Sequence, residues 1–209
     1  MTSYEHALVG VDGALALGLH RRWGWPIVAL AGCASVLPDW DGLTICLGIN
    51  VYGEGHRVWG HNLLLTFVVP AVVGAVFWRF ELITRTQQAL GRRWSMFAIG
   101  GDQTVASGRT RAGLLVWIAV SVVAAYIHLL ADWVYSVGRD LPVWGVPFLW
   151  PFSAREYAWP MVPWGDVGAS VILAIGMFAM LRWLRRTQAI AGGTLGVLVA
   201  YIGVRGCFL

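Results

Sequence analysis

The stretch AGLLVWIAVSVVAAYIHLLADWVYS, residues 112–136, decides the fold of this chain. It is apolar along almost its whole length, and a helix needs about 20 such residues to cross the hydrocarbon core of a bilayer. Near its end it carries His128 and Asp132. Ionisable side chains inside membrane segments are costly and usually serve a function. The stretch therefore predicts a membrane protein with a buried polar site.

The composition of the whole chain agrees with a membrane protein. Of its 209 residues 58% are hydrophobic and 12% charged, whereas soluble domains carry about a quarter charged residues. We expect an all-α, polytopic transmembrane helical bundle with about six membrane segments, forming a single domain over residues 1–209. The third, fourth and fifth segments are long enough to span a bilayer, and the others are short, re-entrant or marginal. The segments are residues 6–20, 25–38, 62–80, 112–136, 167–184 and 189–204.

The basic residues, all arginines, orient these segments. They cluster after the first segment, around the loop between the third and fourth, and at the end of the fifth. Because arginine-rich loops stay in the cytoplasm, an alternating path follows with both termini outside, and Arg205 is a minor exception. The net charge of +4 is thus explained by topology, and no nucleic-acid partner is expected. The clusters comprise Arg21 and Arg22; Arg79, Arg85, Arg92, Arg93, Arg109 and Arg111; and Arg182, Arg185 and Arg186.

Seven side chains of metal-ligand type fall at the opposite, non-cytoplasmic ends of the segments. Imidazole combined with carboxylate favours transition metals over magnesium or calcium. We expect divalent ions, zinc first and manganese second. Seven ligands exceed the four of a tetrahedral zinc site, so they suit two ions, or one ion with supporting residues around its ligands. The predicted metal ligands are His6, Asp39, Asp41, His56, His61, His128 and Asp132.

The spacing of these residues leaves alternatives open. His128 and Asp132 lie one helical turn apart on the same face, where both can bind an ion, Asp132 can orient the imidazole, or the two can form an ordinary hydrogen bond. Asp39 and Asp41 follow Pro38 in a loop, where they can bind an ion or remain solvated.

The five-residue spacing of His56 and His61 does not align them on a regular helix, which turns about 500° over that interval. We expect the pair to straddle a helix start near Gly60. His20 lies on the arginine-rich side and is left out of the predicted site.

Three further residues are candidates for catalysis. Arg57 can clamp a phosphate or carboxylate through its planar fork, or anchor the protein to lipid headgroups. Glu54 can act as a general base or be solvated. Asp12 can face the site or pair with an arginine.

The loop of about 137–166 carries several Trp and Pro residues. Because Trp favours the membrane–water boundary, we expect this loop to lie on the membrane surface as a rim or lid. The chain has no His-Glu-x-x-His motif, no Gly-x-x-x-x-Gly-Lys loop and no Gly-x-Ser-x-Gly elbow, so these common hydrolase and phosphate-binding motifs are absent.

The motifs resemble the YdjM-type family of bacterial inner-membrane proteins, described as membrane-bound metal-dependent hydrolases. The resemblance rests on His6 and on residues 37–41 (LPDWD), 55–61 (GHRVWGH), 128–132 (HLLAD) and 145–152 (GVPFLWPF). It covers most of residues 1–152, and residues 167–204 look like generic membrane helices.

The chain departs from the family pattern around one histidine. Where the family often has His-Arg-Gly-x-Thr-His-Ser, this chain has Val58, Gly60 and Asn62 around His61. The lost hydroxyl groups can alter a supporting or substrate contact without removing a metal ligand.

These observations predict a metal-dependent hydrolase at the extracytoplasmic face of the bacterial inner membrane. It would act on an ester or phosphoester, with a membrane lipid as the expected substrate. Metal-activated water would attack, and Arg57 would steady the developing negative charge. Two alternatives stay open: a metal-ion transporter or sensor, and a scaffold whose metal site is structural. The sequence identifies no protein partner.

Overall fold

The predicted all-α fold is confirmed by the computed structural model of the chain. It describes residues 1–93, 110–137 and 143–208, except the side chains of residues 53–54 and 90–93. Within these ranges the regular structure is helical. The elements are α1 (Ser3–Ala16), α2 (Leu19–Trp23), α3 (Trp25–Ala34), the 3-10 segment η1 (Leu37–Leu47), α4 (Ile49–Gly55), α5 (Leu63–Phe80), α6 (Leu82–Arg93), α7 (Arg111–Val134), α8 (Gly168–Arg182), the 3-10 turn η3 (Leu184–Arg186) and α9 (Thr187–Gly206).

Three helices of the described ranges are long and apolar enough to cross a membrane. They are α5, α7 and the continuous helix Leu184–Gly206 formed by η3 and α9. The sequence predicted that the third, fourth and fifth segments are long enough to span a membrane and that the sixth is marginal. The third and fourth are confirmed, but the fifth is too short and the sixth is long enough. The fifth, α8, has only 15 residues because it ends at Arg182, and the sixth gains length because η3 leads directly into α9.

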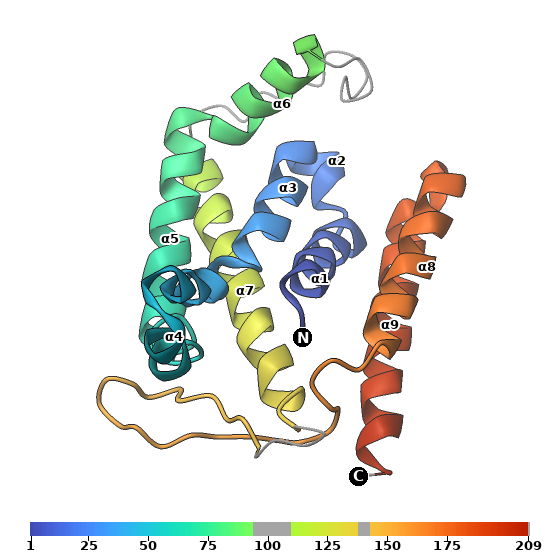
Figure 1. Ribbon diagram of the computed structural model, residues 1–209. Helices are drawn as coiled ribbons and strands as arrows, with labels where there is room; N and C mark the ends of the chain where they lie inside the picture. Colours follow the sequence, from blue (N-terminus) through green and yellow to red (C-terminus); the bar gives the residue numbers. More distant parts are fainter. Residues whose placement is uncertain (94–109, 138–142, 209) are drawn as a thin grey trace.

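Successive long elements alternate in direction, as the arginines predict. In Figure 1, α5 and α7 lie side by side, α8 and α9 form a second pair, and α1 and α3 lie between the two pairs. The arginine-bearing elements α2 and α6 lie at the upper end of this view, and the two labelled termini lie toward the lower end. The predicted ligands must therefore be sought toward the lower half of the bundle.

Small residues bring the two helices α1 and α3 into close contact. A Cβ atom on Gly10 would lie 2.6 Å from the carbonyl oxygen of Ala31, and one on Gly32 would lie 2.9 Å from a methyl carbon of Val11. Small residues at such crossings let the backbones approach, which is how helices pack inside membranes. This contact fixes α1 against the helix that leads into η1.

One stripe of α7 faces the interior of the protein. It begins with small or aromatic residues such as Trp117 and Ser121, and it ends with His128 and Asp132. Gly74 of α5 allows the neighbouring helix to approach, because a Cβ there would lie 2.7 Å from Ser121 Oγ. Inward-facing residues recur about once per helical turn, so the apolar stripe and the two ionisable side chains lie on the same face of α7.

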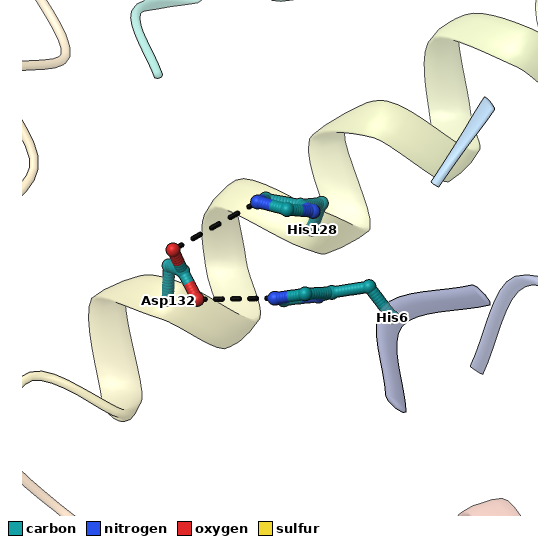
Figure 2. A group of neighbouring side chains, drawn as sticks. All are labelled: His6, His128 and Asp132. Carbon is teal, nitrogen blue, oxygen red and sulfur yellow. Dashed lines mark hydrogen bonds and ion pairs between the residues drawn. The ribbon is translucent and has the colours of Figure 1, made fainter. Parts of the chain in front are cut away.

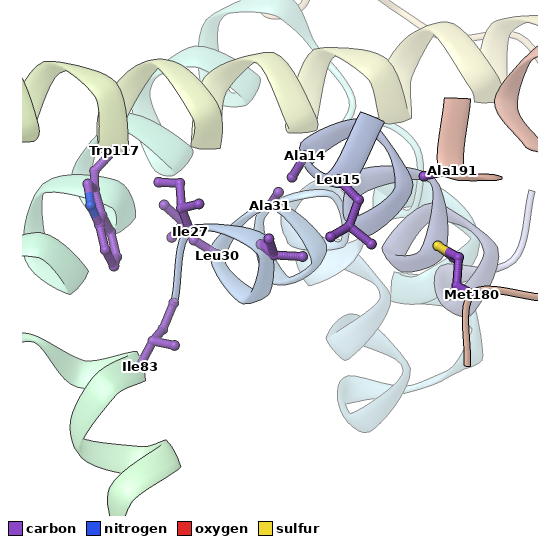
Figure 3. Close-up of a cluster of buried hydrophobic side chains, with 10 residues drawn as sticks. Ala14, Leu15, Ile27, Leu30, Ala31, Ile83, Trp117, Met180 and Ala191 are labelled. Atoms are coloured by element: carbon purple, nitrogen blue, oxygen red, sulfur yellow. The ribbon is translucent and has the colours of Figure 1, made fainter. Parts of the chain in front are cut away.

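Two clusters of buried apolar side chains flank these ionisable residues. The larger joins six elements and is drawn in Figure 3: Ala14, Leu15, Ile27, Val28, Leu30, Ala31, Ile83, Trp117, Met180 and Ala191. The second contains Met1, Tyr135, Val162, Ala169, Leu173 and Leu198. In the sequence, His6 lies between Met1 of the second cluster and Ala14 of the larger one, and His128 lies between Trp117 of the larger cluster and Tyr135 of the second.

Candidate metal centre

Five of the seven predicted ligands converge in the interior, from four separate segments. Two groups have ligand atoms within 4.8 Å of one another, and both groups contain His128. The first is His6, His128 and Asp132, and the second is Asp39, His61 and His128. Four of the five side chains are buried and Asp39 is partly buried. Side chains far apart in the sequence therefore form one cluster able to hold a metal ion.

The first group joins α1 to the last turns of α7. Figure 2 shows the His6 ring lying flat against the ring of His128, with Asp132 reaching toward both. The ring centroids are 3.6 Å apart, and His6 Nε2 lies 3.1 Å from Asp132 Oδ1. His128 Nε2 lies 3.8 Å from the other carboxylate oxygen, Oδ2. One carboxylate thus faces two imidazoles.

The backbone carbonyl of Ser35 determines which nitrogen of His128 carries its proton. His128 Nδ1 lies 2.7 Å from this oxygen, just beyond the end of α3. A carbonyl oxygen only accepts hydrogen bonds, so Nδ1 donates. In the neutral imidazole the lone pair is then on Nε2, which points into the cluster. A backbone partner of this kind is typical of metal-binding histidines.

Asp41 plays the same part for His61. Its Oδ2 atom lies 3.0 Å from His61 Nδ1 and accepts a 2.9 Å hydrogen bond from the backbone N–H of Gly60. Gly60 is required here, because a Cβ atom would lie only 1.9 Å from the carbonyl oxygen of Pro38. The glycine that departs from the family pattern therefore lets the chain bring His61 against Asp41.

The two imidazole nitrogens at the centre lie at metal-ligand spacing from each other and from one oxygen each of Asp39 and Asp132. His61 Nε2 lies 3.1 Å from His128 Nε2, and it lies 3.5 Å from both Asp39 Oδ1 and Asp132 Oδ2. His128 Nε2 lies 3.4 Å from Asp39 Oδ1. Tetrahedral zinc with bonds of 2.0–2.1 Å places its ligand atoms about 3.3 Å apart. The residues present fit a small divalent ion.

The charges in the cluster are compatible with a bound cation. Two carboxylates and the imidazole lone pairs face one point, and like partial charges so close repel unless a proton or metal lies between them. Burial alone would raise the pKa of Asp39, but its contacts with His128, His61 and Ser3 hold it well below its usual range. Asp39 is therefore ionised and available to a cation.

His61 carries the balancing proton when no metal is bound. Its burial disfavours the charged form, but hydrogen bonds to Asp132, Asp39 and Asp41 raise its pKa to about 10. Burial likewise opposes ionisation of Asp41, yet hydrogen bonds from His56, His61 and the Gly60 backbone lower its pKa to about 2. A metal ion would replace the proton on His61 Nε2, so metal binding is coupled to proton release.

The remaining two predicted ligands, Asp41 and His56, lie next to the cluster and belong to neither group. His56 Nδ1 lies 2.9 Å from Asp41 Oδ1, and the His56 side chain is 16% exposed. Asp41 therefore holds two imidazoles, one on each oxygen. Direct binding of a metal by these two side chains stays a prediction.

Arg57, expected to contact substrate, is buried and already paired. Its NH2 atom lies 3.1 Å from Asp132 Oδ2, its NH1 atom donates a 3.0 Å hydrogen bond to the carbonyl oxygen of Trp144, and its guanidinium carbon lies 4.6 Å from the centre of the Trp144 ring. Its backbone has a φ of 63°, which is uncommon for residues other than glycine. The geometry assigns Arg57 to holding Asp132 and Trp144.

The other two catalytic candidates are not brought into the cluster by what the structure describes. Asp12 is buried in α1, further along the helix than His6, and belongs to neither ligand group. Glu54 falls within α4, and its side chain lies outside the described part of the chain.

Sequence reasoning missed several contacts of the cluster. The amino group of Met1 lies 2.9 Å from Asp132 Oδ1. Glu5, next to His6 in the sequence, is buried and accepts hydrogen bonds from Ser170 Oγ and from Thr2. The only signal for Glu5 was its position in a Thr-x-x-Glu pattern at a helix start, which marks a capping box. Backbone partners such as the Ser35 carbonyl leave no signal in the sequence.

Asn62, the other notable departure from the family pattern, shapes the turn that precedes α5. Its side-chain oxygen accepts from Leu65 N–H, and its side-chain nitrogen donates to the carbonyls of Val58 and Trp59. It therefore caps the helix and closes the turn that carries His61, and it makes no contact with the ligand atoms among its hydrogen bonds.

The fold and the cluster define a class: a helical membrane protein with buried groups of His and Asp able to bind a metal ion. The family model described as "YdjM inner membrane protein" matches residues 1–209, and the chain belongs to this family. The match includes the last two helices, which sequence reasoning had treated as generic. The chain is also 30% identical over 186 residues to "Inner membrane protein YbcI" of Escherichia coli (strain K12), which covers 87% of this chain and 80% of the relative. No solved structure gives a significant match.

Proposed function

We propose that the protein is a membrane-embedded, metal-dependent hydrolase acting on an ester or phosphoester, with a membrane lipid as substrate. The observation that carries the proposal is that His61 Nε2 and His128 Nε2 lie 3.1–3.8 Å from each other, from Asp39 Oδ1 and from Asp132 Oδ2. Without a metal, the proton on His61 Nε2 joins the two imidazoles in a 3.1 Å hydrogen bond, and a metal ion would take the place of that proton.

The donor set favours a transition metal. Two imidazoles and two carboxylates suit zinc first and manganese second. A divalent ion held there would polarise a bound ester or phosphoester and activate water. His6, whose Nε2 faces the second oxygen of Asp132, is the fifth donor, and it supplies a place for a second ion or steadies the carboxylate.

The surrounding residues support this chemistry by fixing the ligands. Asp41 and the Ser35 carbonyl set the tautomers of His61 and His128. Arg57 keeps Asp132 ionised and in place. His56 is the partly exposed imidazole of the set, and with Nδ1 on Asp41 it can hold or pass on a proton at Nε2.

The position of the cluster supports a lipid substrate at the extracytoplasmic face. The ligands lie near the end of α7 and just before the start of α5, both of which are long enough to cross a membrane. A site at the end of membrane spans lies near lipid headgroup depth. The arginine-rich elements are at the opposite end of the bundle, which the positive-inside rule assigns to the cytoplasm.

The test is the metal content of the purified protein. Wild-type protein should carry about one or two transition-metal ions per chain, and His128→Ala, which removes the residue common to both groups, should lose them. His20→Ala is the matched control, because His20 lies in α2 outside the cluster, and it should retain the metal. Melting temperatures establish that each variant is folded.

Hydrolysis of lipid phosphoesters by the loaded wild-type protein would then identify the reaction. Metal that stays bound in folded His128→Ala, or wild-type protein that takes up no metal on reconstitution, would overturn the proposal. A folded, metal-loaded protein that hydrolyses none of the esters tried, but carries metal across liposome membranes, would support the transporter alternative instead.

A further inference from the structure

A shallow apolar pocket of about 340 Å³, wide open on its outer side, lies at the junction of α5, α7 and the loop that follows α7. Ligand pockets in proteins have volumes of roughly 300–1,000 Å³, so the pocket is large enough to hold a ligand. Its lining, called the outer pocket here, consists of Leu63, Leu130, Trp133, Phe148, Leu149 and Tyr157. Every one of these side chains is apolar or aromatic.

Hydrogen bonds between backbones hold the walls of the outer pocket. The N–H of Leu63 donates to the carbonyl of Phe148, and the N–H of Trp159 donates to the carbonyl of Trp133. Val146 and Tyr157 exchange two further hydrogen bonds, of 2.8 and 3.0 Å. The loop is therefore fixed to both helices, and the pocket is a built feature of the protein.

The outer pocket is separate from the metal centre although its residues are close in sequence. Leu130 lies between His128 and Asp132, but it is 55% exposed while both of these neighbours are buried. Two residues along a helix turn the side chain by about 200°. The pocket therefore lies on the lipid-facing side of α7, and the metal ligands lie on the inner side.

An arginine that forms no ion pair with the described residues accompanies the pocket. The Arg155 guanidinium carbon lies 5.2 Å from the centre of the Tyr157 ring, and no ion pair forms between Arg155 and the rest of the described chain. In extended backbone, alternate residues share a face. Arg155 and Tyr157 thus lie together, whereas the Glu156 Cβ lies on the other face, against Gly145.

We propose that the outer pocket binds one anionic phospholipid of the bilayer, with an acyl chain among the six lining residues and the phosphate at Arg155. The depth agrees with such a ligand, because Leu63 begins one membrane span and Leu130 and Trp133 belong to the last turns of another. Trp and Tyr at this level are typical of the membrane boundary, and an arginine that has no acidic partner within the described ranges complements a phosphate. This site is independent of the proposed hydrolase activity.

The test uses native mass spectrometry of the full chain released from nanodiscs of equal parts phosphatidylglycerol and phosphatidylcholine. Wild-type protein should retain one lipid, enriched in phosphatidylglycerol. Leu130→Trp fills the pocket and should lose the retained lipid. Arg155→Gln should retain a lipid but lose the enrichment, since the acyl-chain contacts remain.

Leu115→Trp is the matched control, because Leu115 is 65% exposed on the same helix outside the pocket, and it should behave as the wild type does. Leu149→Trp fills the pocket from the loop and replaces Leu130→Trp if that variant fails to fold. Wild-type protein without retained lipid, equal loss in Leu115→Trp and Leu130→Trp, or a second copy of the chain in place of lipid would overturn the proposal.

Discussion

At Asp41 a single carboxylate holds two imidazoles and a backbone amide. Its Oδ2 atom binds His61 and Gly60, and its Oδ1 atom binds His56. The carboxylate is fully buried, and these contacts keep it ionised. It fixes the His61 ring so that Nε2 points at the other ligands, which is how a supporting residue can control a metal site without touching the ion.

Replacing Asp41 by Asn should weaken metal binding without abolishing it. Asn replaces one of the two accepting oxygens by an NH2 donor, so the side chain can no longer hold His56, His61 and the Gly60 amide together and the His61 ring can change its tautomer and orientation. Loss of such a supporting contact typically costs about 10- to 100-fold in affinity. Competition of the purified variant with a chelator of known affinity measures the change. Asp39→Asn, which removes a predicted ligand, should cost more, and a smaller loss for Asp39→Asn than for Asp41→Asn would contradict these assignments.

The raised pKa of His61 predicts how the metal-free protein responds to pH. Because its pKa rises from 6.5 to about 10 on folding, its protonated form stabilises the fold. This stabilisation is fully present below about pH 6.5 and is lost as pH rises through about 10. Chelator-treated protein should therefore melt at progressively lower temperature between these values. His61→Gln should flatten that part of the profile, and an equally steep decline in the variant would refute the assignment.

Among whole elements, the loop after α7 is tied to the metal centre through one arginine. Arg57 joins Asp132 of α7 to the carbonyl of Trp144, while the 3-10 segment η1 supplies Asp39 and Asp41. The cluster is thus assembled from irregular segments that are held by a few polar contacts. These segments connect membrane helices whose packing is set by apolar side chains and glycines.

Arg57→Ala should destabilise the protein by at most about 3–5 kcal/mol, because the buried carboxylate of Asp132 loses its guanidinium partner but keeps the Met1 amino group and His6. Arg57→Lys should restore only part of this stability, since an ammonium group cannot reproduce both contacts of the planar fork. Unfolding by sodium dodecyl sulfate, followed by tryptophan fluorescence, gives the values. Arg111→Ala, at an exposed arginine at the start of α7, is the control. A loss no greater than in this control would show that the Arg57 pairing contributes little.

The elements themselves were largely predictable, and the contacts between them were predictable only in part. The length of the apolar stretches predicted the helices around residues 62–80 and 112–136. It did not predict the break at Trp183, where α8 ends and the next helical turn begins. The convergence of His61 and His128 followed from their shared side of the membrane. The support given by the Ser35 carbonyl and the pairing of Arg57 depend on backbone positions and turns that no periodicity encodes.

For the whole molecule, the arrangement of helices predicts sidedness. The loop containing Glu156 should face the extracytoplasmic space, and the turn containing Arg185 should face the cytoplasm. In a background lacking the three natural cysteines, Glu156→Cys should react with a membrane-impermeant maleimide in spheroplasts. Arg185→Cys should react only after permeabilisation. The opposite pattern would place the metal centre on the cytoplasmic side.

His6 and Asp132, which touch across the centre of the molecule, are 126 residues apart in the chain. A nascent chain inserts its first helices long before α7 emerges from the ribosome, so His6 and Asp39 enter the membrane without their partners on α7. The cluster can close only when His128 and Asp132 arrive. Capture of an ion would then mark the completion of membrane insertion, and chains that fail to place α7 would be left with unpaired buried charge and be exposed to proteolysis.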